Sequence, residues 1–229
     1  MLSHYPRLQK GALPGLLPKL GGLPWGLPAR LWPVCQECGQ PMSHLLQLPA
    51  DPAVLPDMAA DEVLFVFKCE GEDVCSFWEP DGGANTVFTV QRQDLGDAPT
   101  AAPVSSEQQA PTQLLELGIN GWRLDDDGAP PELESAFYDY GAHSDLPEEI
   151  AFPHHWASAW RTKVGGVPYW TANGAQQVPP GRLLLQIDNW LTLEDGSGTE
   201  IANFCSDGTA FVFVDRQQIP PAYSLLINR

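Results

Sequence analysis

The sequence lacks long apolar runs and has few cysteines. No stretch of about 18 consecutive apolar side chains occurs in its 229 residues, so we expect no membrane-spanning helix. Residues 1–10 lack the apolar centre of a signal peptide, and we therefore expect a soluble, cytoplasmic protein that does not bind membranes. Five cysteines are too few and too unevenly spaced for a disulfide scaffold, which favours free or metal-bound thiols in a reducing compartment.

Positive charge is also scarce. The chain has 12 Lys and Arg against 29 Asp and Glu, a net charge of −17. Residues 31–160 contain three basic and 23 acidic residues, a net charge of −20, whereas the rest of the chain carries +3. Such a field repels nucleic acid and steers a basic protein toward the middle of the chain, although it also serves solubility alone.

Signatures of catalysis are missing as well. The sequence has no Gly-x-Ser-x-Gly elbow and no cysteine beside a histidine that would act as its base. The adjacent His154 and His155 point in different directions on a helix or strand. We therefore expect a protein that is not an enzyme; the alternative is an enzyme with a cleft between two halves that uses one of these histidines.

The chain repeats itself. Residues 19–25, Lys-Leu-Gly-Gly-Leu-Pro-Trp, return at 163–169 as Lys-Val-Gly-Gly-Val-Pro-Tyr. Each copy is followed by Leu-Leu-Gln, which ends at Gln47 or Gln186, and then by a short apolar run. Because each lysine precedes its glycines, a phosphate-binding loop is disfavoured. We predict a structural turn in which the glycine pair makes the bend and each buried glutamine bonds the loop to the sheet.

Local patterns predict an α+β, β-rich fold with two pseudo-repeated halves, each built on short antiparallel strands. Runs of β-branched and aromatic residues bounded by Gly, Pro or Asp predict strands at 63–67, 86–90, 183–187, 210–214 and 224–227. Short helices are expected at 113–116, 133–140 and 145–160, the last broken at Pro153. Most of the eight tryptophans are expected in the core or at the join between the halves.

The same patterns suggest how the chain is divided. We expect a first half at residues 1–95, an acidic excursion at 96–160 and a second half at 161–229, together forming one compact unit. The excursion begins with residues 96–111, which are rich in Ala, Pro, Ser and Gln and predict a long connection.

Four cysteines of the first half predict a metal site. Cys35 and Cys38 are separated by two residues and precede a glycine, which is typical of a zinc knuckle. Cys69 and Cys75 follow a predicted strand and would complete a zinc-ribbon-like, four-thiolate structural site. The spacing of this second pair is wider than the usual two-residue gap, so four free thiols are the alternative.

An acidic segment supplies the expected partner surface. Residues 125–149 contain nine acidic residues, no Lys or Arg, and several aromatics. Asp125–Asp127 lacks the alternating ligands of a calcium loop and predicts an acidic turn. Acid mixed with exposed aromatics is a surface that would grip a basic protein, and a solvated face is the alternative. The residues expected to bind a partner are Asp125, Asp126, Asp127, Glu132, Glu134, Tyr138, Asp139 and Tyr140.

The repeated Lys-x-Gly-Gly-x-Pro-aromatic loops with Leu-Leu-Gln resemble the bacterial YwqG-like family of unknown function. The first loop, together with Cys35-Gln36-Glu37-Cys38-Gly39-Gln40-Pro41 and residues 64–69, is similar to the amino-terminal part of programmed cell death protein 2 and its relatives. The resemblance covers residues 19–80 and 163–215 and leaves the acidic middle unmatched.

These resemblances imply a cytosolic binding protein. Programmed cell death protein 2 and its relatives act as chaperones for a basic ribosomal protein. Bacterial relatives resemble proteins encoded beside secreted toxins, and acidic immunity proteins cap the basic active sites of nuclease toxins by charge complementarity. The function expected from the sequence is a mask for a basic protein, most concretely an immunity protein against a nuclease-type toxin, with a chaperone as the alternative.

Overall fold

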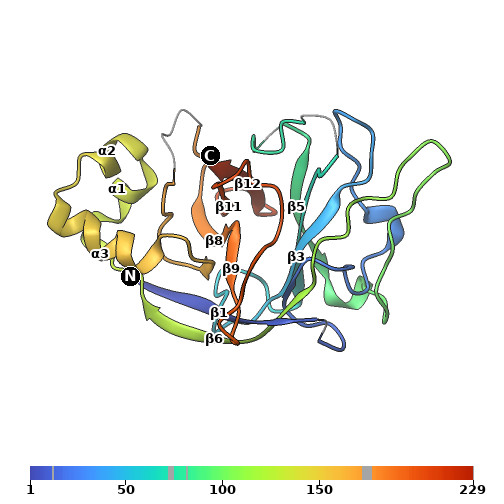
Figure 1. The fold of residues 1–229 in the computed structure, drawn as a ribbon, viewed down its shortest axis with the longest axis horizontal. Coiled ribbons are helices and arrows are strands. Elements are labelled where there is room, and N and C mark those ends of the chain that lie inside the picture. Colours follow the sequence, from blue (N-terminus) through green and yellow to red (C-terminus); the bar gives the residue numbers. More distant parts are fainter. Residues whose placement is uncertain (12, 72–74, 81, 172–176, 229) are drawn as a thin grey trace.

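The computed structural model describes residues 1–11, 13–71, 75–80, 82–171 and 177–228 (Figure 1). Its main feature is a ten-stranded antiparallel sheet with the order β12-β11-β8-β7-β1-β6-β2-β3-β4-β5. The strands are β1 Leu2–Lys10, β2 Lys19–Leu20, β3 Ser43–Pro49, β4 Glu62–Lys68, β5 Asn85–Gln91, β6 Leu117–Asp126, β7 Lys163–Val164, β8 Arg182–Asp188, β11 Thr209–Asp215 and β12 Ala222–Asn228. A separate hairpin pairs β9 Trp190–Thr192 with β10 Gly198–Glu200.

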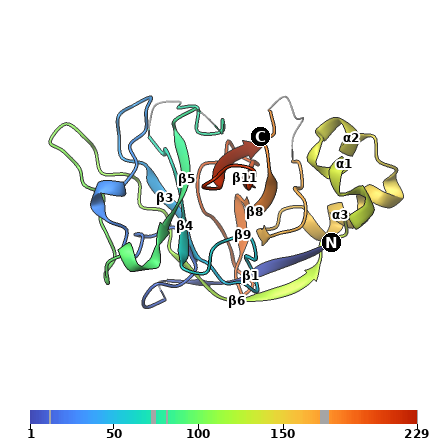
Figure 2. The same ribbon diagram turned by 180° about the vertical axis from the view of Figure 1, so that it is seen from behind.

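Helices make up a small part of the described chain. They are η1 Ala29–Leu31, η2 Arg92–Asp94, η3 Pro131–Leu133, α1 Glu134–Tyr138, α2 Tyr140–Ser144 and α3 Glu148–Ser158. The three α-helices group together at one side of the sheet, beyond the strands of the second half (Figures 1 and 2). A β-rich α+β fold is therefore confirmed.

The five predicted strands are present as β4, β5, β8, β11 and β12. β4 and β11 lie inside the sheet and have both faces covered, so their side chains are buried almost without interruption. The phenylalanines of the two strands, Phe65 and Phe67 in β4 and Phe211 and Phe213 in β11, have no exposed surface. Continuous apolar runs are typical of strands buried on both faces.

Each half follows the same order of strands: one long strand, one two-residue strand, and three further strands that pair in sequence. β1, β2, β3, β4 and β5 correspond in this order to β6, β7, β8, β11 and β12. The long strands are exchanged, because β1 pairs with β7 of the second half and β6 pairs with β2 of the first half. β1 and β6 also pair with each other and so join the halves in the middle of the sheet.

The sheet curves until its two ends come together. The side chain of Asn85 in β5 donates a hydrogen bond to the carbonyl of Leu225 in β12 over 3.3 Å, and the N–H of Ile227 donates to the carbonyl of Trp78 over 3.1 Å. One apolar core contains residues of both halves. The two halves are thus one packed unit.

Some local expectations differ from the structure. Residues 113–116 form no helix, and the expected helix at 133–140 is divided into α1 and α2. α3 continues through Pro153, because buried residues beyond the proline, His154 and Ser158, bond to the carbonyl of residue 127 and hold the helix in place. The segment 96–160 contains β6, so it is not only an excursion, and the expected acidic turn begins as the end of this strand.

In the parts of the chain that the structure describes, no helix has the length and apolar character needed to cross a membrane.

Candidate metal centre and partner surface

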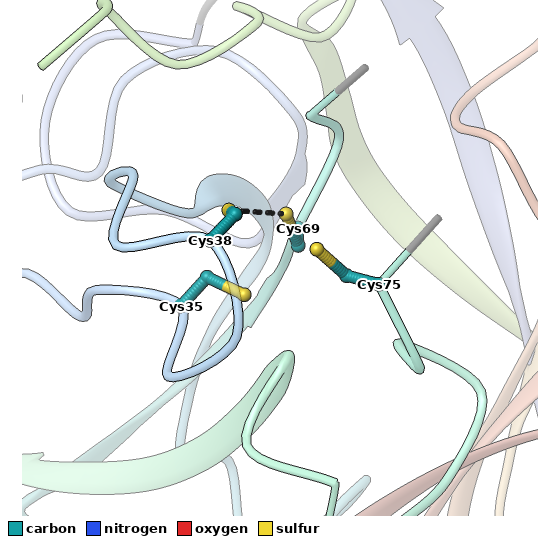
Figure 3. A group of neighbouring side chains, drawn as sticks. All are labelled: Cys35, Cys38, Cys69 and Cys75. Atoms are coloured by element: carbon teal, nitrogen blue, oxygen red, sulfur yellow. Dashed lines mark hydrogen bonds between the residues drawn. The ribbon is translucent and has the colours of Figure 1, made fainter. Parts of the chain in front are cut away.

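The four cysteines of the first half come together in space (Figure 3). Their sulfur atoms all lie within 4.8 Å of one another, and the sulfurs of Cys38 and Cys69 are 3.7 Å apart. All four are free thiols, since this distance is far longer than a disulfide bond. Cys35, Cys69 and Cys75 are buried and Cys38 is partly exposed.

The backbone around the first cysteine pair curls as a knuckle requires. The N–H of Cys35 donates to the carbonyl of Gln40 over 2.9 Å, and the N–H of Gly39 donates to the carbonyl of Cys35 over the same distance. Gly39 has a φ of 71°, a left-handed conformation that glycine adopts without strain. Both oxygens of the Glu37 carboxylate accept from the N–H of Ser76, which fixes the knuckle beside Cys75.

The second pair is placed by the sheet. Cys69 directly follows β4, and the N–H of Cys69 bonds to the carbonyl of Ala84, which leads into β5. The hairpin thereby returns the chain near Cys75 to the knuckle. The expected proximity of the four residues is confirmed, although residues 72–74 between them lie outside the described chain.

The surroundings affect the four thiols differently. Burial raises the pKa of Cys69 to about 11 and moves the pKa of Cys75 in the same direction. Burial also acts to raise the pKa of Cys38, but hydrogen bonds from the Gln40 N–H and from neighbouring thiols outweigh it, and this pKa lies below its usual value. A cation among the sulfurs would favour the thiolate form of all four.

The cluster fits a tetrahedral metal ion. For four sulfurs at about 2.3 Å from a central zinc ion, tetrahedral geometry requires sulfur–sulfur distances of about 3.8 Å. The distance of 3.7 Å between Cys38 and Cys69 agrees with this value, and the other distances, up to 4.8 Å, need only small side-chain shifts. Cys205 is outside this cluster of described residues.

The first repeat loop is a structural element, as its sequence predicts. Gly21 and Gly22 have φ values of 60° and 64°. The side-chain oxygen of Gln47 accepts from the N–H of Trp25 over 2.6 Å, and its amide donates to the carbonyl of Leu17 over 3.0 Å. Lys19 donates to the carboxylate of Glu116 over 2.5 Å. The glutamine thus ties the loop to β3.

The second repeat loop has the same plan with a more deeply buried charge. The side-chain oxygen of Gln186 accepts from the N–H of Tyr169 over 3.0 Å. Lys163 donates to Asp127 over 3.1 Å and to Ser158 over 2.9 Å, and all three side chains are fully buried. Burial lowers the pKa of Lys163 to about 8, and the negative charge of Asp127 acts in the opposite direction.

This burial removes Asp127 from the expected partner surface. Its carboxylate also accepts from the N–H of Val167 over 3.0 Å, inside the second repeat loop. Burial acts to raise the pKa of Asp127, but the charge of Lys163 and hydrogen bonds from the Met1 amino group and Val167 outweigh it, so the pKa is lowered. Asp127 binds the protein's own lysine.

The other residues of the expected surface lie closer to solvent. Asp125, Asp126, Glu132 and Asp139 are exposed, whereas Glu134, Tyr138 and Tyr140 are half-buried. Their internal contacts differ. The Tyr138 hydroxyl accepts from the Leu183 N–H, Glu134 pairs with Arg182 over 2.6 Å, and Asp139 caps α2 by accepting from the Ala142 N–H.

Two exposed aromatics of α3 were missed by the sequence analysis. Phe152 and Trp156 are 54% and 77% exposed, and their rings stack with centroids 6.3 Å apart. Their spacing of four residues places them on one face of a helix, which the sequence would have indicated if the helix had not been expected to break at Pro153.

Comparison with known proteins gave no match to a family model and no match to a curated protein.

Proposed function

We propose that the protein binds and masks a basic protein partner, and that it acts most concretely as an immunity protein against a nuclease-type toxin. The observation that carries the proposal is the surface of the helical segment 131–158, called here the acidic lobe. It contains six acidic residues and no Lys or Arg, and all of the six except Glu134 are exposed. Among the described residues of the lobe, only Glu134 takes part in a Lys or Arg ion pair.

The acidic lobe combines this charge with apolar anchors. Phe152 and Trp156 project from the same helix that carries Glu148 and Glu149 in its first turn. A large aromatic side chain within a charged rim is the usual composition of a binding hot spot. The partner expected from this chemistry has Lys or Arg side chains around an apolar recess.

A groove of about 570 Å³ extends the charged surface toward β6. Asp126 lines it from the end of β6 and Glu149 lines it from α3, and the apolar residues Ile150 and Pro131 are also part of the lining. An extended basic side chain could lay its methylene stem on the apolar floor and its charge against the carboxylates.

We propose zinc as the ion of the cysteine cluster, in a structural role. Four thiolates fill a tetrahedral site and leave no position for water or substrate. The ion would stabilise the first half, while the acidic lobe of the second half would make the contact with the partner.

The proposal is tested by isolating the protein from its own cells. A basic polypeptide should co-purify in near-equal amount, and its affinity should fall as salt rises, because exposed charges are screened. Trp156→Ala should weaken the complex by about 2 kcal/mol or more. Glu148→Gln with Glu149→Gln should reduce mainly the association rate.

Matched controls lie elsewhere on the same chain. Trp190→Ala removes another exposed tryptophan, and Asp94→Asn removes an exposed carboxylate of the first half. Neither should change the affinity for the basic partner. Equal loss in the control and lobe variants, or a complex insensitive to salt, would contradict the proposed surface.

A chaperone for a ribosomal or other basic protein is the second candidate. It is favoured by the four-cysteine cluster, which is formed by the motif that carries the resemblance to programmed cell death protein 2. Co-expression distinguishes the two: an immunity protein should restore growth of cells that make its toxin, whereas a chaperone should raise the soluble yield of its client without such protection.

A further inference from the structure

A groove with an excess of positive charge lies beside β1. It has a volume of about 530 Å³, and three of the chain's eight arginines line it: Arg7, Arg123 and Arg161. Its acidic lining residue is Glu194, so the lining carries more positive than negative charge in a protein whose net charge is −17. All three arginines are exposed. A local excess of this sign attracts anions.

The sheet brings two of these arginines over one ring. Tyr5 of β1 and Arg123 of β6 are direct neighbours in the register of the sheet. The guanidinium carbons of Arg123 and Arg161 lie 5.6 Å and 5.4 Å from the centre of the Tyr5 ring. Stacking on an aromatic ring holds a guanidinium in place and leaves its edge N–H groups available for a planar anion.

The third arginine stands opposite a bulge in β6. The pairing of the two strands shifts between Pro6 and Leu8, where Arg7 faces two residues of β6, Asn120 and Gly121. A bulge bends its strand and increases the local twist. Gly121 lies beside the stem of Arg7, since a Cβ there would make an ordinary contact of 3.8 Å with the Arg7 Cδ.

Two exposed tryptophans form part of the lining above an apolar floor. Trp160 and Trp190 are 64% and 54% exposed, and the floor is buried Leu8, Leu191 and Leu193. Trp190 packs closely on Gly198 of the hairpin, where a Cβ would lie 2.5 Å from the indole ring. Its ring is thus held on the β9–β10 hairpin, which bonds to β1 through the Glu194 N–H and the Leu8 carbonyl over 2.9 Å.

Trp160 is held in an uncommon conformation. Its φ of 52° is left-handed, a strained conformation for a non-glycine residue. The neighbouring backbone is fixed by Gln186, which donates to the carbonyls of Ser158 and Arg161 over 3.1 Å and 2.7 Å. The repeat glutamine therefore fixes the turn that presents both Trp160 and Arg161 to the groove.

We propose that this groove is a binding site for a small organic anion that carries a flat ring next to a carboxylate or phosphate group. The ring would lie on the apolar floor against Trp160 and Trp190, and the anionic group would meet Arg123 and Arg161. Small-molecule sites are usually apolar grooves on which a few polar groups converge. The proposal does not rest on the masking function, because the residues that line the groove do not include the lobe aromatics Phe152 and Trp156.

Isothermal titration calorimetry with ligands that share one ring tests the charge requirement. Indole-3-acetate should bind with a Kd below about 1 mM and about tenfold more tightly than indole or tryptamine, which have the same ring with no charge or a positive one. Adenosine 5′-monophosphate against adenosine repeats the comparison for phosphate. The pair of ligands in which the charged member binds more tightly identifies the preferred anionic group, carboxylate or phosphate.

Variants locate the site. Arg161→Gln and Trp190→Ala should each weaken binding about tenfold, whereas Trp190→Phe should retain most of it. Asp125→Asn should tighten binding, because Asp125 pairs with Arg123 over 3.4 Å and competes with the ligand. Arg92→Gln and Trp156→Ala remove an exposed arginine and an exposed tryptophan outside the groove, and both should leave the affinity for the anion unchanged.

Three results would overturn the proposal: no saturable binding of either anion, equal binding of indole and indole-3-acetate, or equal loss in the groove variants and the two controls. Circular dichroism of each variant before titration separates a lost site from a lost fold.

Discussion

The two halves share a plan of five strands but differ in what their connections carry. In the first half, the connection from β1 to β2 is short, residues 11–18, while the next one contains the cysteine knuckle. In the second half, the connection from β6 to β7, residues 127–162, carries the acidic lobe, and the β9–β10 hairpin is added later. The common strands provide the scaffold, and the cysteine cluster and the acidic lobe lie in or beside the segments that the halves do not share.

The repeat loops themselves differ in how their charge is buried. Lys19 meets Glu116, whose side chain is 25% exposed, whereas Lys163 meets Asp127, which has no exposed surface. A Cβ on Gly22 would press on the movable Glu116 side chain, but one on Gly166 would lie 2.1 Å from the held Asp127 oxygen. The second loop is therefore the more rigidly specified of the two.

Replacing one cysteine in each half should give the largest difference in stability between the two halves. Cys69→Ser should lower the free energy of unfolding by more than about 4 kcal/mol, because it opens the proposed zinc site. Cys205→Ser, in a half-buried position of the second half, should cost less than about 1 kcal/mol. Thermal unfolding with and without a zinc chelator, together with elemental analysis, measures both effects.

A folded Cys69→Ser protein of unchanged stability, or much less than one zinc per chain in protein purified without added metal, would contradict a structural zinc site.

Breaking the ion pair of each repeat loop should give the next largest difference in stability between the two halves. Lys163→Met leaves the buried Asp127 carboxylate with the Met1 amino group, 2.9 Å away, as its remaining cation, and we expect a loss of about 3 kcal/mol in the free energy of unfolding. Lys19→Met should cost about half as much, because Glu116 can turn toward water. Urea unfolding of both variants makes the comparison.

Asp127→Asn in the Lys163→Met background serves as the control for this comparison. It should recover part of the loss by removing a buried charge that has lost one of its two cations. Equal losses for the two lysine variants would show that the halves do not differ in this respect.

The sequence predicted what depends on neighbours along the chain. Buried strands such as β4 and β11 were evident from their β-branched and aromatic runs, and the Cys-x-x-Cys spacing indicated the knuckle. The exchange of β1 and β6 was not evident, because both strands are interrupted by Pro or Gly and pair only with distant segments. Such pairing is decided by the whole sheet.

The same limit explains the misplaced residues. Asp127 follows two exposed aspartates and has the same local sequence pattern as they have. Its carboxylate, however, accepts a hydrogen bond from the N–H of Val167, which lies 40 residues farther along the chain. The arginine groove was not predicted, since Arg7, Arg123 and Arg161 come from three distant segments. Most of the eight tryptophans were expected in the core or at the join between the halves, and their sequence context did not indicate that Trp156, Trp160 and Trp190 are exposed.

Per pH unit, the smallest expected effect is a pH dependence that each half provides through one buried histidine. His44 bonds to the carbonyls of Gly21 and Gly22, and His154 to those of Asp127 and Pro168, so each supports one repeat loop. Burial, and then the charge of the nearby lysine, lowers the pKa of His44 to about 3 and that of His154 to about 4.

Below pH 6.5 the unfolded chain therefore binds protons that the folded protein does not, and the free energy of unfolding falls as the pH falls. Each histidine contributes up to about 1.4 kcal/mol per pH unit, between pH 6.5 and 4 for His154 and down to pH 3 for His44. His154→Gln should flatten the dependence in the upper window only, His44→Gln should flatten it over both, and His4→Gln in β1 serves as the control. Urea unfolding at half-unit pH intervals measures the slopes. An unchanged slope in both variants would show that neither histidine is buried in its neutral form, and the support of each loop would then have to come from Gln47 and Gln186 alone.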